Sequence, residues 1–133
     1  MLATTEVKKE NKFQATLEYL GEYHGVQNAV IFDSNGLVVG YLDRDGLDAE
    51  LLSPFALLIL DQISSLLVRL DEAPVKSMML KNDSSWIIIE RVENLILAVR
   101  AGKETDELLK VRIGRSIDMI KDCLKKNYPQ VTR

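Results

Sequence analysis

Three apolar runs in the second half of the chain are joined by connections too short for anything except hairpins. The runs are Val75 to Lys81, Trp86 to Val92 and Leu95 to Ala101, separated by residues 82–85 and 93–94. Parallel neighbours need a crossover of a dozen or more residues, so these strands must be antiparallel. The last two are apolar almost without interruption, whereas a strand with one wet face alternates. The sequence therefore predicts an antiparallel sheet that is covered on both faces.

A further hairpin and three helices complete the predicted fold. Val26 to Asp33 and Leu37 to Leu42 are strand-like and flank the tight turn Ser34-Asn35-Gly36. Apolar residues at helical spacing predict three helices: residues 6–22, Pro54 to about Glu72 after a Ser53 N-cap, and a last helix after a Thr105 N-cap. The order α-β-β-α-β-β-β-α predicts an α+β fold, in which a five-stranded antiparallel sheet lies between one long middle helix and two terminal helices.

The middle helix is more apolar than a helix that only lies on a sheet. With residues about 100° apart, its large apolar side chains fill an arc of roughly 200°, about twice what a surface helix needs. Each large side chain left in water forgoes roughly 1.5–3 kcal/mol of burial, and monomers seldom carry such a patch. We expect a helix–helix interface, most simply with a second copy across a two-fold axis. Cover by the terminal helices or by a loop remains the alternative.

The strand from Val75 to Lys81 enters from a helix, which favours a place at the sheet edge. Its centre carries no charge, and exposed edges of that kind template further pairing. The alternative is that Pro74, Lys76 and Lys81 guard the edge. The predicted dimer or partner interface consists of Phe55, Ala56, Ile59, Ile63, Leu66, Leu67, Leu70, Ser77, Met78, Met79 and Leu80.

No constellation in the sequence indicates catalysis, a cofactor or a metal. His24 is the only histidine and Cys123 the only cysteine, so neither a nucleophile–base pair nor a structural zinc site is evident. The acidic turn Asp43–Asp48 lacks the glycine and glutamate spacing of an EF-hand loop. The segment Ala101–Thr105 lacks the upstream glycine of a phosphate loop. We therefore expect a protein that is not an enzyme.

The net charge and the hydropathy of the chain argue against a nucleic-acid partner and against insertion in a membrane. The net charge of −3 argues against a nucleic-acid partner, which usually requires a basic surface. The N-terminal segment is polar, and the longest apolar run, Phe55 to Leu60, is far short of the roughly 20 residues of a membrane span. A lone cysteine gives no sign of an oxidising compartment. We expect a cytoplasmic protein that is not inserted in a membrane.

Several local patterns carry a resemblance to a known family. They are the first helix ending at Gly25-Val26, the hairpin 29–40, the long apolar middle helix, and Leu95 to Arg100 followed by a helix with Ile113-Gly114-Arg115. Together with the element order, they resemble the Roadblock/dynein light chain family. The resemblance covers about residues 10–126 and implies one Roadblock-like domain across residues 1–133.

The resemblance implies a function through protein–protein binding. Family members form homodimers, or heterodimers with a paralogue, through the middle helix and third strand. They act as regulators or scaffolds for small Ras-like GTPases, or as motor light chains. Arg44 and Arg69 are candidates to meet a partner's phosphate, although surface arginines more commonly form salt bridges. Two alternatives stay open: a structural scaffold or motor light chain without effect on a nucleotide cycle, and a small-molecule sensor domain.

Overall fold

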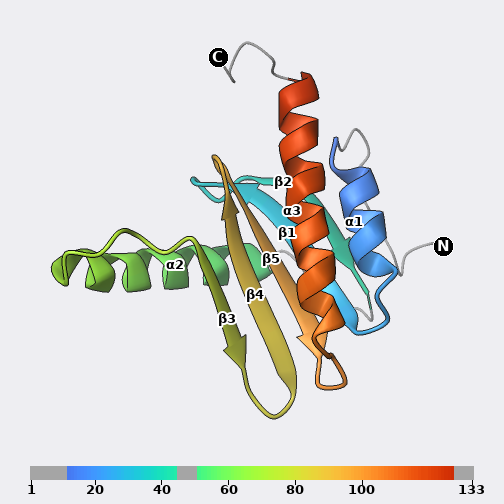
Figure 1. Ribbon diagram of the computed structural model, residues 1–133, viewed down its shortest axis with the longest axis horizontal. Coiled ribbons are helices and arrows are strands. Elements are labelled where there is room, and N and C mark those ends of the chain that lie inside the picture. Colours follow the sequence, from blue (N-terminus) through green and yellow to red (C-terminus); the bar gives the residue numbers. More distant parts are fainter. Residues whose placement is uncertain (1–11, 45–50, 128–133) are drawn as a thin grey trace.

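A five-stranded antiparallel sheet with the order β2-β1-β5-β4-β3 forms the centre of the structure (Figure 1). The structure is a computed structural model and describes residues 12–44 and 51–127. The strands are β1 (Val26–Asp33), β2 (Val38–Asp43), β3 (Ser77–Lys81), β4 (Ser85–Val92) and β5 (Leu95–Gly102). The helices are α1 (Gln14–Gly21), α2 (Leu52–Arg69) and α3 (Leu108–Asn127). The predicted element order and the antiparallel pairing are confirmed.

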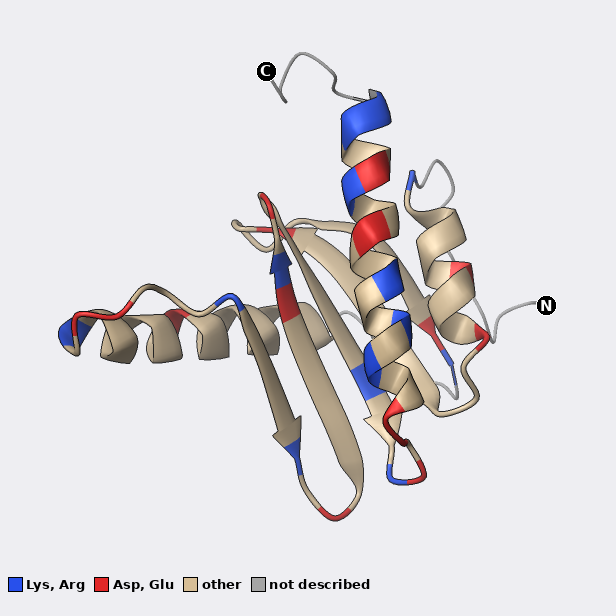
Figure 2. Cartoon of the chain, viewed as in Figure 1, with Lys and Arg blue, Asp and Glu red and all other residues tan. Residues whose placement is uncertain are grey.

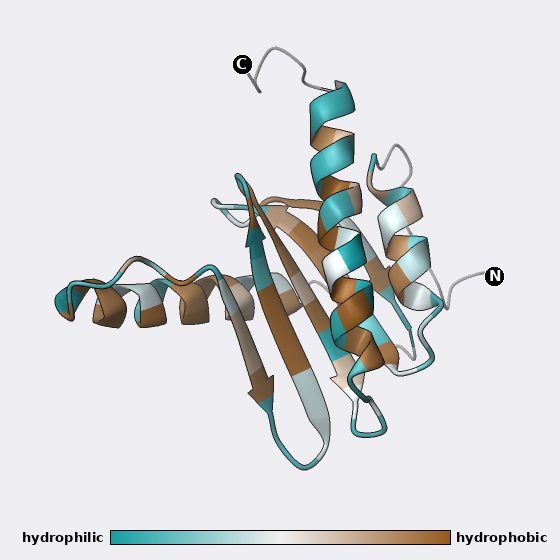
Figure 3. Ribbon diagram, in the orientation of Figure 1, coloured by the Kyte–Doolittle hydropathy of each residue, from teal (hydrophilic) through white to brown (hydrophobic). Residues whose placement is uncertain are grey.

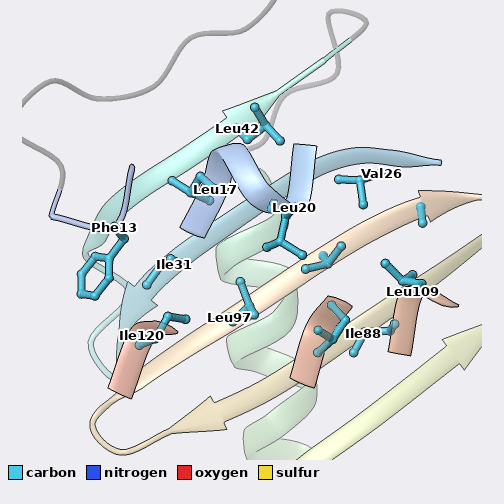
Figure 4. Close-up of a cluster of buried hydrophobic side chains, with 14 of the residues drawn as sticks. Phe13, Leu17, Leu20, Val26, Ile31, Leu42, Ile88, Leu97, Leu109 and Ile120 are labelled. Carbon is cyan, nitrogen blue, oxygen red and sulfur yellow. The ribbon is translucent and has the colours of Figure 1, made fainter. Parts of the chain in front are cut away.

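The two faces of the sheet are covered as predicted, by α2 on one side and by α1 and α3 on the other (Figure 1). The α1/α3 side holds the larger apolar cluster, in which Leu17, Leu97 and Ile120 are fully or almost fully buried (Figure 4). The α2 side holds a second cluster, built around Phe32 and Leu60. Both clusters draw on alternate residues of the same strands, which explains why the central strands are apolar without interruption.

Some helix ends differ from the predictions. α2 begins at Leu52, so Ser53 lies inside the helix and is buried. At the start of α3, the side chain of Asp106 accepts a hydrogen bond from the Leu108 N–H at 3.1 Å. The Thr105 hydroxyl instead donates to the Gly102 carbonyl at 2.5 Å. Asp106 is therefore the cap, and the predicted Thr105 cap is wrong.

Two more predicted boundaries move. β3 begins at Ser77 rather than Val75. The Val75 side chain packs in the α2-side cluster, and the Val75 N–H donates to the Ser64 hydroxyl at 3.1 Å, so this residue contacts α2 before the strand begins. α2 ends at Arg69, before the predicted end at about Glu72. Just after the helix, Asp71 takes a left-handed conformation with φ 65°. The predicted start of the first helix at residue 6 lies outside the described residues.

Polar tethers join the end of α1 to its surroundings. Arg112 on α3 donates to the Tyr19 carbonyl at 2.6 Å and pairs with Glu22 at 3.3 Å. The Tyr23 hydroxyl donates to the Asp106 carboxylate at 2.7 Å and accepts from the Asp106 N–H at 3.0 Å. Burial, more than the neighbouring Asp106 carboxylate, raises the pKa of Tyr23 above its ordinary value. These contacts hold the end of α1 against α3. Most of the large apolar side chains that stay exposed lie on α2 or directly beside it.

Candidate partner interface

α2 presents four sides, of which one is buried in the protein's own core. Ala56 and Leu60 face the sheet and are fully buried. Ile63 and Leu67, at helical spacing from them, are half-buried against the same cluster. The prediction that Ala56 belongs to the partner interface is therefore wrong, because this chain's own sheet already covers its side chain.

One flank of α2 is covered by the chain as it turns back to β3. Leu57 lies beside Gly36 in the β1–β2 turn. Further along the same flank, the Ser64 hydroxyl accepts the hydrogen bond from the Val75 N–H. The returning segment thus occupies the space beside this half of the helix, so a partner must approach from elsewhere.

The opposite flank is apolar and open. Phe55 is 40% exposed and Leu66 is 53% exposed, and the half-buried Ile59 lies about 20° beyond Leu66 around the helix. This flank points toward the β3–β4 turn, since Phe55 and Asn82 line one hollow. We call Phe55, Ile59 and Leu66 the open flank. All three belong to the predicted interface.

The C-terminal half of α2 extends past the edge strand β3 and has no sheet beneath it (Figure 1). Leu66, Val68 and Leu70 are each more than half exposed in this overhang. The overhang is largely hydrophobic, with charged residues gathered where the helix ends (Figures 2 and 3). Within the described part of the chain, the terminal helices and the loops leave it uncovered.

The whole helix is apolar enough to pass a simple membrane test. By length and composition alone, Leu52–Arg69 could cross a membrane, yet only 22% of it is buried in the structure. A core helix of a soluble protein passes the same test, and α2 lies flat on a sheet through Ala56 and Leu60.

β3 is an edge strand that pairs with β4 and leaves its other side open. Met78 and Leu80 are half-buried, and Met78 packs in the α2-side cluster. Met79 packs on the α1/α3 side, so the sequence prediction combined residues from both faces of the sheet. The Ser77 hydroxyl donates to the Glu90 carboxylate at 2.6 Å, which ties the start of β3 to β4.

One of the two lysines proposed to guard this edge, Lys81, contacts an aromatic ring of the neighbouring strand. The Lys81 ammonium lies 4.4 Å from the centroid of the Trp86 ring, a cation–π contact. Lys76 is exposed but precedes the strand. The backbone of β3 therefore remains available for pairing along its uncharged centre.

The arginine candidates differ in availability. Arg44 donates to the carbonyls of Val26, at 3.0 Å, and of Gly21, so it caps the end of α1 and does not project toward a partner. Arg69 is exposed at the end of α2. His24 is also exposed, and Cys123 is half-buried on α3. Across residues 12–44 and 51–127, no group of three His, Cys, Asp or Glu side chains is placed to hold a metal ion.

Sequence reasoning missed two features of this surface. Leu58 points away from the sheet and is 59% exposed, although nothing in the sequence separates it from its buried neighbours. Arg100 lies on β5, two residues before the end of the strand, and lines the hollow at the start of α2. A signal for Arg100 existed, namely a charge at an otherwise apolar position of a doubly covered strand.

Structures with the same fold include MglB from Myxococcus xanthus, with a TM-score of 0.78 at 15% identity, covering 90% of this chain and 99% of that one. A Roadblock/LC7 domain from Streptomyces avermitilis gives 0.70 at 22% identity, covering 83% and 95%. The gliding protein MglB from Thermus thermophilus gives 0.75 at 13% identity, covering 86% and 90%. At these identities the likeness concerns the fold.

The sequence comparisons decide the family. Curated protein sequences give no match to this chain. The family model described as the Roadblock/LC7 domain matches residues 12–101, from just before α1 to the penultimate residue of β5. That span includes α2, the edge strand β3 and all but the last residue of the sheet. This chain belongs to the Roadblock/LC7 domain family.

Proposed function

We propose that this protein is a non-catalytic regulator or scaffold of a small Ras-like GTPase, and that it works as a dimer. The observation that carries the proposal is the overhang of α2. A helix that runs past its own sheet with three leucine or valine side chains more than half exposed needs a partner surface. The family resemblance, which implies dimers that act on such GTPases, supports the same conclusion.

The dimer would form through the open flank of α2 and the free edge of β3. Two copies related by a two-fold axis place the same patch on both sides of the contact. β3 would pair with β3 of the second copy, and the two α2 helices would lie side by side. One MglB structure of this fold is described as a tetrameric arrangement, so self-association occurs in a protein of similar architecture. A paralogue in place of the second copy is an outcome that the experiment separates.

The outward side of α2 is the surface that we assign to the GTPase. Leu58, Asp61 and Ser65 lie on this side and are exposed, with Arg69 near its end. It stays uncovered when the open flank pairs. Two such helices side by side would form one continuous surface, with an apolar centre and charged surroundings, as is typical of partner-binding sites.

The test is binding of small GTPases from the same organism, each loaded with GDP or with a non-hydrolysable GTP analogue. We expect binding that depends on the nucleotide, and Leu58→Asp should abolish it while leaving the dimer intact. Val111→Asp is the matched control, because Val111 is 66% exposed on α3, on the other side of the sheet. No binding in either nucleotide state would argue against the proposal.

Measurement of GTP hydrolysis separates regulator from scaffold. A changed rate in the presence of the protein supports a regulator, whereas binding at an unchanged rate supports a scaffold. Co-purification with a larger protein, without any GTPase, would favour the motor light chain alternative. Light scattering of the isolated protein distinguishes a homodimer from a monomer that dimerises only with a paralogue.

A further inference from the structure

The hollow at the start of α2 combines an apolar wall with hydrogen-bond donors. It measures about 490 Å³ and lies on the α2 side of the sheet. Leu51, Phe55 and Ile87 supply apolar lining, while Asn82, Ser85 and Arg100 supply polar groups. The Asn82 carboxamide oxygen accepts from the Ser84 and Ser85 N–H groups, at 2.8 and 2.9 Å, which leaves its NH₂ group to donate. Among the described residues, no acidic side chain lines this hollow.

Arg100 is the charged group of the hollow. It is half-buried on β5, with Asn28 and Ile87 as its cross-strand neighbours. The ion pairs of the described chain are Lys110–Glu107 and Arg112–Glu22, and neither includes Arg100. A guanidinium presents five donors in a planar fork. The hollow is thus suited to an apolar group followed by an anion or by carbonyl oxygens.

The far end of α2 has the complementary character. Leu66 and Leu70 are 53% and 70% exposed there. Asp71 and Glu72 follow directly, are exposed, and belong to neither ion pair of the described chain. The C-terminus of a helix also carries partial negative charge. The end of α2 therefore complements its start. The apolar side chains at the end match the apolar wall of the hollow, and the acidic groups match Arg100.

Antiparallel packing of two α2 helices brings these two ends together. α2 has 18 residues and is about 27 Å long. Its open flank includes Phe55, which also lines the hollow. If two open flanks pack across a two-fold axis, the end of one helix lies beside the start of the other. Each dimer then has two such contacts, related by symmetry.

We propose that the hollow at the start of α2 receives the last turn of α2 from a second copy, with Arg100 pairing with Asp71 and Glu72 of that copy. The proposal rests on the dimer proposed above. It adds the contact that sets the relative direction and register of the two α2 helices. The apolar flank supplies attraction, and the charge pair selects the antiparallel arrangement, since a parallel one would leave Arg100 without an anion.

A charge-swap experiment on the full chain tests the contact. The dimer dissociation constant is measured by analytical ultracentrifugation for wild type, Arg100→Glu, Glu72→Arg and the double variant. Each single reversal should weaken the dimer by about tenfold or more, since two contacts of roughly 0.7 kcal/mol each are lost per dimer. The double variant should recover most of the affinity. Raised salt should weaken the wild-type dimer more than the Arg100→Gln dimer.

Lys121→Glu is the matched control, because it makes the same charge change at an exposed position on α3, on the other side of the sheet. Circular dichroism checks that each variant folds, and Arg100→Gln replaces Arg100→Glu if the latter does not. A Leu66→Asp variant tests the dimer itself. If Leu66→Asp gives monomers while Arg100 variants keep wild-type affinity, the contact is refuted and the dimer stands. Failure of the double variant to recover also refutes the contact, and a wild type that is monomeric refutes both.

Discussion

Replacing Leu66 with aspartate separates assembly from folding. Leu66 is 53% exposed in one copy, so about half of its burial energy is still to be gained. Full burial of leucine contributes about 2 kcal/mol, so pairing gains about 1 kcal/mol per copy. An unpaired carboxylate in the interface costs roughly 2 kcal/mol more per copy. Because a symmetric dimer contains the change twice, its dissociation free energy should fall by roughly 6 kcal/mol, about four orders of magnitude in Kd.

The same substitution should barely affect the folded monomer. The carboxylate at position 66 reaches water in a single copy, and exposed substitutions usually alter stability by about 0.5 kcal/mol or less. Light scattering measures the mass, and urea unfolding of the variant measures monomer stability. The expected result is a folded monomer at micromolar concentration, with Val111→Asp still dimeric. A Leu66→Asp protein that remains dimeric would refute the assignment of the open flank.

Three further predictions concern the fold. Glu93 has φ 57° in the β4–β5 turn, so Glu93→Gly should stabilise the protein by about 1 kcal/mol in urea unfolding; an unchanged midpoint contradicts this. Because the pKa of Tyr23 is raised in the folded protein, this side chain contributes to the free energy of unfolding below its ordinary pKa of 10.0. That contribution is lost as the pH rises through the higher folded value. Wild type should therefore lose stability above pH 10 more steeply than Tyr23→Phe, and parallel pH curves would contradict the raised pKa of Tyr23 in the folded protein. Leu60→Ala should cost about 2–5 kcal/mol of unfolding free energy, because Leu60 is fully buried, whereas Leu58→Ala should change it by less than about 0.5 kcal/mol; equal effects would show that the facing of α2 is wrong.

The fold could be predicted because short connections restrict strand direction. Two residues between β4 and β5 permit only a hairpin, and uninterrupted apolar strands require cover on both faces. Helix ends were less predictable, because capping depends on side-chain geometry. Thr105 and Asp106 are both good N-cap types, and only the structure shows that Asp106 accepts the helix N–H.

From the sequence, the proposed interface could be assigned to α2 but not residue by residue. A wide apolar arc predicts that the helix has more than one covered side, yet it does not show which side meets the sheet. Ala56 was therefore placed in the interface although it is in the core, and the exposed Leu58 was left out. Arg100 was missed because its place in the hollow beside α2 is a property of three-dimensional packing.

The position of β2 at the other end of the sheet limits how far assembly can proceed. The proposed pairing of β3 with β3 would use that edge in both copies and leave β2 as the outermost strand at each end. β2 has six residues, and its pairing with β1 shifts register between Ile31 and Phe32. An irregular edge is a poor template for further strands. In the proposed dimer, growth along the sheet would therefore stop at two copies, and the assembly would be a closed particle and not a filament.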